Sequence, residues 1–227
     1  MPVTYNVEYF DDIKLSAASF STVLFGLNFA GELIYREDVD TQVQAMISGV
    51  LAPVYTRSDM YEAQASTLYV ANPKFLWYDE IIFVGEVKYL HVADVRAPAR
   101  QNGIDLVGDG EQLFADESSY GYQALMYLTS RNLVPGWDLK NTLSAGDIVK
   151  GNPALAGSFG ALYAEGDQRF SFGVSMQYLQ NLEFAVAYNW LRGDPGARIR
   201  GDEGNSYVQQ NPYADRDYMT LTVKYNL

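Results

Sequence analysis

Cysteine is absent from the 227 residues of the chain, and histidine occurs once, as His91. The absence of cysteine excludes disulfide scaffolds, thiolate metal sites and cysteine nucleophiles. A single histidine excludes histidine-rich zinc sites and mechanisms that need two histidines. Basic residues are also scarce, because 16 Lys and Arg stand against 28 Asp and Glu, a formal net charge of -12. An acidic chain repels phosphates, so we exclude nucleic acid as a partner.

The chain also lacks a long apolar run, since no stretch approaches the roughly 18 consecutive apolar residues of a transmembrane helix. Residues 1–10 lack the basic and apolar regions of a signal peptide. Two alternatives follow: the protein is cytoplasmic, or its signal peptide has been removed or is not part of this sequence. Aromatic residues and glycine are abundant, with 18 Tyr, 11 Phe, 3 Trp and 19 Gly. We associate this composition with secreted or outer-membrane β proteins.

Apolar residues alternate with polar or small ones in segments of roughly 9–11 residues, the length of a tilted transmembrane strand. In the clearest segment, 181–190, the side chains on one face are Leu182, Phe184, Val186, Tyr188 and Trp190. The period predicts about ten strands, at 3–10, 13–23, 28–36, 61–71, 80–91, 119–131, 137–148, 170–178, 181–190 and 218–227. A helix remains an alternative only at 41–51. No linker interrupts the chain, so we expect one domain over residues 1–227.

The two faces of these strands differ in a way that favours a membrane barrel. The polar face often carries Gly, Ala, Ser, Asn and Gln, whereas a soluble sheet shows Lys, Glu and Thr to water. Aromatic residues gather where the strands end, as they do at the two interfaces of a membrane. Near one rim we expect Tyr120, Tyr122, Phe170, Tyr188 and Trp190, and near the other Trp137, Tyr178 and Tyr225. The alternative is a soluble sheet with ordinary core aromatics.

Loop lengths favour the same architecture. If the last strand runs towards the periplasm, the short connections 24–27, 72–79, 132–136 and 179–181 lie on the periplasmic side. The long connections 37–60, 92–118, 149–167 and 193–215 then lie outside. Short periplasmic turns and long external loops are typical of outer-membrane barrels. We therefore predict an all-β, antiparallel, up-and-down transmembrane β-barrel.

Six charged residues fall on the face that the alternation assigns to the lumen: Glu32, Arg36, Glu86, Lys88, Glu183 and Lys224. A cation facing lipid at mid-depth costs about 2–4 kcal/mol, so these side chains should face water or each other. We predict a paired lumenal network that lines or plugs a pore. A closed barrel of about ten strands is narrow, because only roughly sixteen or more strands leave a wide aqueous channel.

Candidate chemistry outside the lumen is sparse. Asp215, Arg216 and Asp217 have the groups to hold a divalent cation or a lipopolysaccharide phosphate, but an exposed salt-bridge cluster is favoured. Residues 108–111 and 201–204 resemble incomplete fragments of calcium loops. His91, with Asp94 nearby, is the one candidate for acid–base catalysis, and a simple rim histidine is favoured. We therefore expect no enzymatic activity, no resident metal and no cofactor.

Several segments carry a resemblance to a known family: 12–21, Gly-Glu-Leu-Ile-Tyr-Arg at 31–36, 172–178, 188–194 and 214–227, where Asp215-Arg216-Asp217 opens the last strand. From about residue 10 to the end, the chain resembles the domain of unknown function 1302 family of Gram-negative outer-membrane barrels. Members of that family are usually more than twice as long and carry a signal peptide. The resemblance therefore implies the C-terminal part of a larger barrel. The chain ends in Leu227 where barrels generally end in Phe, and its tail resembles a signal for the barrel-assembly machinery.

The resemblance implies an outer-membrane location, in contact with membrane lipid and lipopolysaccharide. It also implies transport of hydrophobic or amphiphilic compounds, with a periplasmic partner protein and a proton-driven inner-membrane exporter. Two other functions remain open: a non-transporting structural or adhesive barrel, and a soluble β-barrel that binds small ligands.

Overall fold

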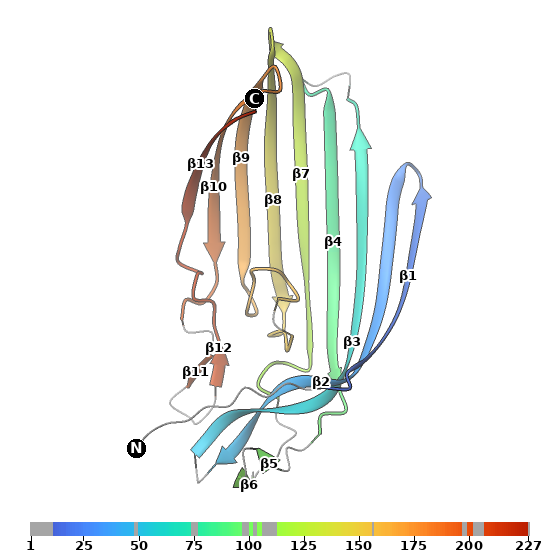
Figure 1. Cartoon of the computed structure of the whole chain (residues 1–227), viewed down its shortest axis with the longest axis vertical. Coiled ribbons are helices and arrows are strands. Elements are labelled where there is room, and N and C mark those ends of the chain that lie inside the picture. The colour runs from blue at the N-terminus through green and yellow to red at the C-terminus, as the bar shows by residue number, and fades with distance from the viewer. Residues whose placement is uncertain are drawn as a thin grey trace.

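The computed structural model of the chain is built on one antiparallel sheet (Figure 1). It describes residues 11–47, 50–73, 77–96, 100–101, 104–105, 113–155, 157–196, 199–201 and 207–226. Within these ranges the sheet has nine strands: β1 (Lys14–Leu24), β2 (Leu27–Ile47), β3 (Val50–Ala71), β4 (Glu80–Ala93), β7 (Ser118–Val134), β8 (Trp137–Lys150), β9 (Gln168–Tyr178), β10 (Leu182–Arg192) and β13 (Tyr218–Tyr225). Spatial order follows chain order, and every described pairing in this sheet is antiparallel. The predicted all-β, up-and-down architecture is confirmed at this level.

The sheet is open, because its edge strands β1 and β13 each pair with one neighbour among the described residues. Every residue of both edge strands is exposed. The accessible surface of the chain is 14328 Å², against about 10,000 Å² for a compact soluble protein of this mass. The excess fits an extended sheet whose two faces are largely uncovered.

The described strands coincide with nine of the ten predicted ones, and the tenth, at 3–10, lies outside the described residues. The prediction for 37–60 was wrong, because β2 continues to Ile47 and β3 begins at Val50. A helix at 41–51 is contradicted by the same pairing, in which Val43 faces Val54 across the hairpin. A β-bulge interrupts the ladder between Arg36 and Val39. Beyond it, the hairpin turns across the lower end of the sheet (Figure 1).

The connections are sorted by length as predicted, with one exception: β2 reaches Ile47 and β3 begins at Val50, where the long loop 37–60 was predicted. Four short connections, at 25–26, 72–79, 135–136 and 179–181, join strands at one end of the sheet, which we call the turn end. β13 finishes at the same end, where the Asn226 N–H donates to Asn181 O at 2.8 Å. The long connections between β4 and β7, β8 and β9, and β10 and β13 lie at the opposite end, the loop end (Figure 1). It also carries two small hairpins, β5 (Arg100–Gln101) with β6 (Ile104–Asp105), and β11 (Ile199–Gly201) with β12 (Tyr207–Gln209).

Strand register gives the sheet one apolar face and one polar face. Directly paired residues point to the same side of a sheet. On one side, a row of paired apolar residues crosses eight strands: Leu27, Tyr69, Phe83, Met126, Leu143, Phe172, Tyr188 and Met219. The next row on the same side, closer to the turn end, includes Ile81, Leu128, Val174, Val186 and Leu221. These rows form the apolar face. The side chains between them, facing the other way, are mostly small, polar or charged and form the polar face.

The buried core lies at the loop end. One cluster contains Val39, Met60, Leu90 and Val92, and a second, at the end of the β2–β3 hairpin, contains Val43 and Val54. A third cluster joins Ile148 of β8 to Phe159 and Leu162 of the β8–β9 connection. The sheet is therefore packed on its polar face near the loops, and the apolar face keeps large exposed side chains along its whole height.

Candidate functional site

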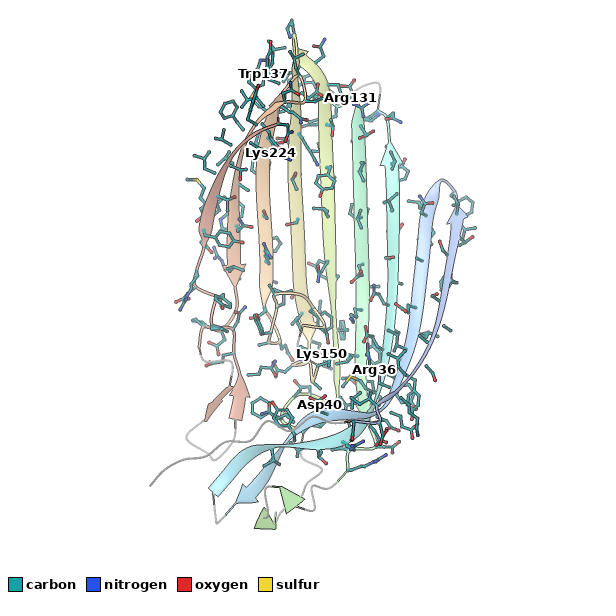
Figure 2. All side chains as sticks on the ribbon, viewed as in Figure 1. Arg36, Asp40, Arg131, Trp137, Lys150 and Lys224 are labelled. Carbon is teal, nitrogen blue, oxygen red and sulfur yellow. The ribbon has the colours of Figure 1, made fainter. Side chains whose placement is uncertain are left out.

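All six charged residues predicted for one face do share the polar face. Glu32, Glu86 and Glu183 pair across the sheet with Gln64, Gln123 and Lys224. Arg36 and Lys88 belong to the same set of rows, since they alternate in step with Glu32 and Glu86 along β2 and β4. The six do not form one cluster, because Arg36 lies near the loop end and Lys224 near the turn end (Figure 2).

A buried carboxylate joins two of the predicted cations. The Glu62 side chain on β3 is only 4% exposed, and its Oε2 lies 2.6 Å from Arg36 Nη1. Its Oε1 lies 2.5 Å from Lys88 Nζ. Three neighbouring strands thus contribute one charge each to an ion triad, Arg36–Glu62–Lys88. Both carboxylate oxygens are engaged, as a buried charge requires.

The remaining predicted charges make looser contacts. Glu86 Oε2 accepts a hydrogen bond from Gln64 Nε2 at 2.9 Å. Glu183 and Lys224 face each other across β10 and β13 near the turn end. Among the described residues no two of the six form an ion pair with each other. Arg36 and Lys88 meet at Glu62 instead, and the other members are distributed along the same face.

The connection from Gly151 to Asp167, here called the inner loop, lies against the polar face. Its Phe159 and Leu162 are 2% and 4% exposed and pack on Ile148. Gly121 makes room for Phe159, because a Cβ there would lie 3.0 Å from the Phe159 ring and 2.4 Å from Asp147 O. A Cβ on Gly146 would reach Leu162 Cδ1 at 3.5 Å, an ordinary contact.

Backbone and carboxylate contacts hold the inner loop in place. Asp167 Oδ2 accepts from the N–H groups of Tyr163 at 2.8 Å and Ala164 at 3.0 Å. The backbones of Ile148 and Asp167 also bond to each other, from Ile148 N to Asp167 O at 3.0 Å. Burial raises the pKa of Asp167 above its usual value, although the two N–H donors act in the opposite direction. The loop is therefore closed around a carboxyl group that burial pushes towards its neutral form.

A pocket of about 380 Å³ lies between the inner loop and the sheet. Its floor includes a row that runs across four strands, Glu86, Gln123, Gly146 and Arg169. Its other walls include the apolar side chains Val84, Leu125, Phe159 and Leu162. Opposite charges therefore stand at the two ends of a cavity that is otherwise largely apolar.

The predicted rim cluster, Asp215–Arg216–Asp217, divides into one structural residue and two exposed ones. Asp217 Oδ1 accepts from Leu191 N at 2.9 Å and lies 3.1 Å from Arg192 Nη1, which ties the end of β10 to the start of β13. These donors lower the pKa of Asp217, the Leu191 N–H contributing most. Arg216 Nε lies 3.9 Å from Asp215 Oδ1, and both side chains are mostly exposed. The geometry agrees with an ordering role for Asp217.

His91 lies on the apolar face near the loop end. Its Nδ1 is 2.9 Å from Ser118 Oγ, its Nε2 is 3.7 Å from Glu117 Oε1, and its ring stacks on Tyr89. These contacts agree with a rim histidine. Within the described residues, no group of three or more His, Asp or Glu side chains is placed to hold a metal ion. The described residues also contain no helix long and apolar enough to cross a membrane.

The aromatic residues predicted for the two rims lie towards the two ends of the apolar face. At the loop end, Tyr120 and Tyr122 lie near the start of β7, Phe170 near the start of β9, and Tyr188 and Trp190 near the end of β10. At the turn end Trp137 and Tyr178 pair across β8 and β9, with ring centroids 5.0 Å apart. Figure 2 shows Trp137 at that end.

Comparison with family models matches the whole chain, residues 1–227, to the family described as "Protein of unknown function (DUF1302)". The chain belongs to this family. The resemblance carried by its C-terminal strands and by Gly31–Arg36 is thereby confirmed over the full length. Comparison with curated proteins gives no match.

Two features of the polar face were not predicted. Glu62 belongs to a strand with weak alternation, and its role becomes apparent only when register places it between Arg36 and Lys88. The inner loop was expected to be an external loop at 149–167. Its apolar Phe159 and Leu162, within a stretch otherwise rich in Gly and polar residues, are the signal that could have indicated a packed loop.

Proposed function

We propose that this member of the DUF1302 family is an outer-membrane β-barrel, or part of one, that conducts hydrophobic or amphiphilic compounds. The observation that carries the proposal is the contrast between the two faces of the sheet. One face presents continuous rows of exposed aromatic and aliphatic side chains, and the other holds a buried ion triad and a packed loop.

The apolar face supports a lipid environment. Val186, Phe184 and Leu221 are 42%, 43% and 76% exposed, and they belong to rows that continue over most of the sheet. Monomeric soluble proteins rarely expose contiguous apolar patches above a few hundred Å². A soluble ligand-binding barrel would turn this face to water, whereas a bilayer solvates it and so removes the cost.

Strand direction supports closure through further strands. In a nine-stranded antiparallel sheet, β1 and β13 run in the same direction, so they cannot pair antiparallel with each other. Antiparallel closure therefore needs an odd number of additional strands, and the even total is usual for bacterial outer-membrane barrels. The predicted strand at 3–10 would complete ten, and a larger barrel takes three or more. Open edges in hydrocarbon would cost several kcal/mol for each unsatisfied backbone group.

A second function, a non-transporting structural or adhesive barrel, is favoured by the inner loop. This loop lies on the polar face and occupies space that a conduit would need. In a barrel of about ten strands, such a loop would close the lumen, because narrow barrels are already filled by side chains. In a larger barrel the same loop narrows the path without closing it.

Flux through lipid vesicles distinguishes the two functions. The purified full chain is reconstituted into vesicles, and release of a trapped amphiphilic dye is compared with release of a small hydrophilic dye. A conduit for amphiphiles accelerates release of the amphiphilic dye over protein-free vesicles. Vesicles that contain correctly inserted protein but release neither dye faster than protein-free ones contradict the conduit and favour the structural barrel.

A further inference from the structure

Among the described residues, Arg169 on β9 is a cation without a counter-charge. Its Nη2 donates to two neutral groups, Tyr218 Oη at 3.2 Å and Asn189 Oδ1 at 3.4 Å. Its Nε is buried and has no hydrogen-bond partner among the described residues. No carboxylate in the described part of the chain forms an ion pair with it, although the chain carries a net charge of -12.

This arrangement is unusual for a half-buried guanidinium. Other arginines of the described chain are paired: Arg36 with Glu62, Arg131 with Glu80 and Arg192 with Asp217. Burying a charge is costly unless it is paired and hydrogen-bonded. Guanidinium groups bind carboxylates and phosphates through two parallel hydrogen bonds. An unpaired Arg169 with a free buried Nε is therefore suited to an anion that comes from outside the chain.

The surroundings of Arg169 specify the rest of the ligand. The pocket it helps to line has a volume of about 380 Å³ and is bounded by Leu125, Phe159 and Leu162. Small-molecule sites commonly measure about 300–1,000 Å³ and combine apolar walls with a few polar groups. Glu86 stands three strands away in the same row, about 14 Å along the sheet at the usual strand spacing. Its carboxylate repels an anion at that end, so the anionic group of a bound molecule is directed to Arg169.

We propose that the pocket between the inner loop and the polar face binds a single-chain amphiphile with an anionic headgroup. Arg169 holds the headgroup, and Leu125, Phe159 and Leu162 contact the hydrocarbon. The inference rests on the proposed conduit, because it names the class of compound that the conduit carries. It also assigns a role to the inner loop, which supplies the apolar wall of the site.

The test is calorimetric titration of the full chain in non-ionic detergent. The probes share one chain length: decanoate, decyl phosphate, decanol and decyltrimethylammonium. The site predicts that decanoate or decyl phosphate binds at least tenfold more tightly than decanol, and the difference between the two anions identifies the headgroup. The cationic probe should bind most weakly, because Arg169 repels it.

Three variants make the test specific. Arg169→Gln should weaken binding of the anionic probes tenfold or more, since hydrogen bonds to charged groups are among the strongest. Phe159→Ala should weaken both the anionic probes and decanol. Arg131→Gln, an arginine with a 58% exposed side chain at the turn end, is the matched control and should bind like the original chain. Far-UV circular dichroism checks that each variant keeps its sheet.

The proposal is overturned if folded Arg169→Gln binds decanoate as tightly as the original chain. Equal affinity for decanol and both anions overturns it as well. Titration needs no vesicles, so its failure is distinct from that of the flux experiment. Anion binding without flux supports the site and contradicts the conduit. If the original chain conducts the dye but binds no anion, and Arg169→Gln conducts equally well, the conduit is supported and the site is contradicted.

Discussion

Glu62 stabilises the polar face by neutralising two cations at once. Removing one partner of a buried ion pair leaves an uncompensated charge, which typically costs about 3–5 kcal/mol. Glu62→Gln keeps the size of the side chain but leaves Arg36 and Lys88 without a carboxylate. We expect it to lower the free energy of unfolding by about 3 kcal/mol or more, measured by guanidinium chloride unfolding of the detergent-solubilised chain.

Glu80→Gln is the matched control for this prediction. It removes an exposed ion pair with Arg131, at 3.0 Å, near the turn end. Exposed pairs contribute about 0–1 kcal/mol, so this variant should unfold close to the original chain. Equal losses in the two variants would mean that Glu62 has no special structural importance.

Two glycines on the polar face should respond differently to the same substitution. In Gly121→Ala the new Cβ meets Asp147 O at 2.4 Å and the Phe159 ring at 3.0 Å, and a backbone atom cannot move aside cheaply. We expect a loss of about 1–3 kcal/mol, the usual cost of overpacking. In Gly146→Ala the nearest atom is at 3.5 Å, so its stability should change by less than about 0.5 kcal/mol. Thermal unfolding of both variants measures the difference, and equal midpoints would contradict the close packing around Gly121.

Single residues also show where sequence alone stops being informative. The alternation assigned Arg36 and Lys88 to one face, because side chains alternate with period two along a strand. It could not assign them a partner, since the pairing depends on the register of β3 against both neighbours. The surroundings of Arg169 were equally hidden, because the sequence alone does not show that it lacks an ion pair among the described residues.

Two loop carboxylates give the connections opposite responses to pH. The pKa of Asp217 is lowered, so its contribution to stability is present above the usual carboxyl pKa and is lost as pH falls through the lowered value. The pKa of Asp167 is raised, so its contribution is largest at low pH and is lost as pH rises through the raised value. We expect Asp217→Asn to lose less stability than the original chain as the pH falls into the acid range. Asp167→Asn should lose less stability than the original chain as the pH rises through the raised pKa of Asp167. Unfolding midpoints measured against pH test both signs, and parallel curves for the two variants would contradict the assignment.

Strand β10 provides a paired test of the two faces. Val186 lies on the apolar face and Ala187 on the polar face. Arginine facing lipid at mid-depth costs about 2–4 kcal/mol, so Val186→Arg should block assembly into the membrane or strongly weaken it. Ala187→Arg should be milder, as judged by the amount of folded protein in the outer-membrane fraction. The face assignment is refuted if the two variants assemble equally poorly.

Strands with strong alternation were predictable, and those that depend on distant contacts were not. The segment 181–190 was predicted within two residues of β10, because its alternation is uninterrupted. The loop-end half of the β2–β3 hairpin was missed, although Val39, Thr41 and Val43 do alternate with polar residues. Its polar composition resembles a loop, and pairing across the hairpin together with a bridge from Val43 to Leu113 stabilises it as strand.

At the scale of the whole molecule, the sheet has one apolar and one polar face, as a membrane barrel requires. The order of its strands could be predicted because each strand pairs with its neighbour in the chain. Simple up-and-down order places alternate connections at opposite ends of the sheet. Closure could not be predicted, because it depends on how many strands join β1 to β13. The place where the inner loop packs could not be predicted either, because it depends on the space that Gly121 leaves in β7 for Phe159.

The most direct test of the account is cysteine labelling of β10 in lipid vesicles, which is clean because the chain has no cysteine of its own. Phe184→Cys and Val186→Cys place the thiol on the apolar face, and Ala185→Cys and Ala187→Cys place it on the polar face. A small water-soluble thiol reagent should modify positions 185 and 187 quickly and positions 184 and 186 slowly, and all four equally after denaturation. Equal rates in the intact vesicles, or faster modification at 184 and 186, would contradict a barrel with its apolar face in lipid.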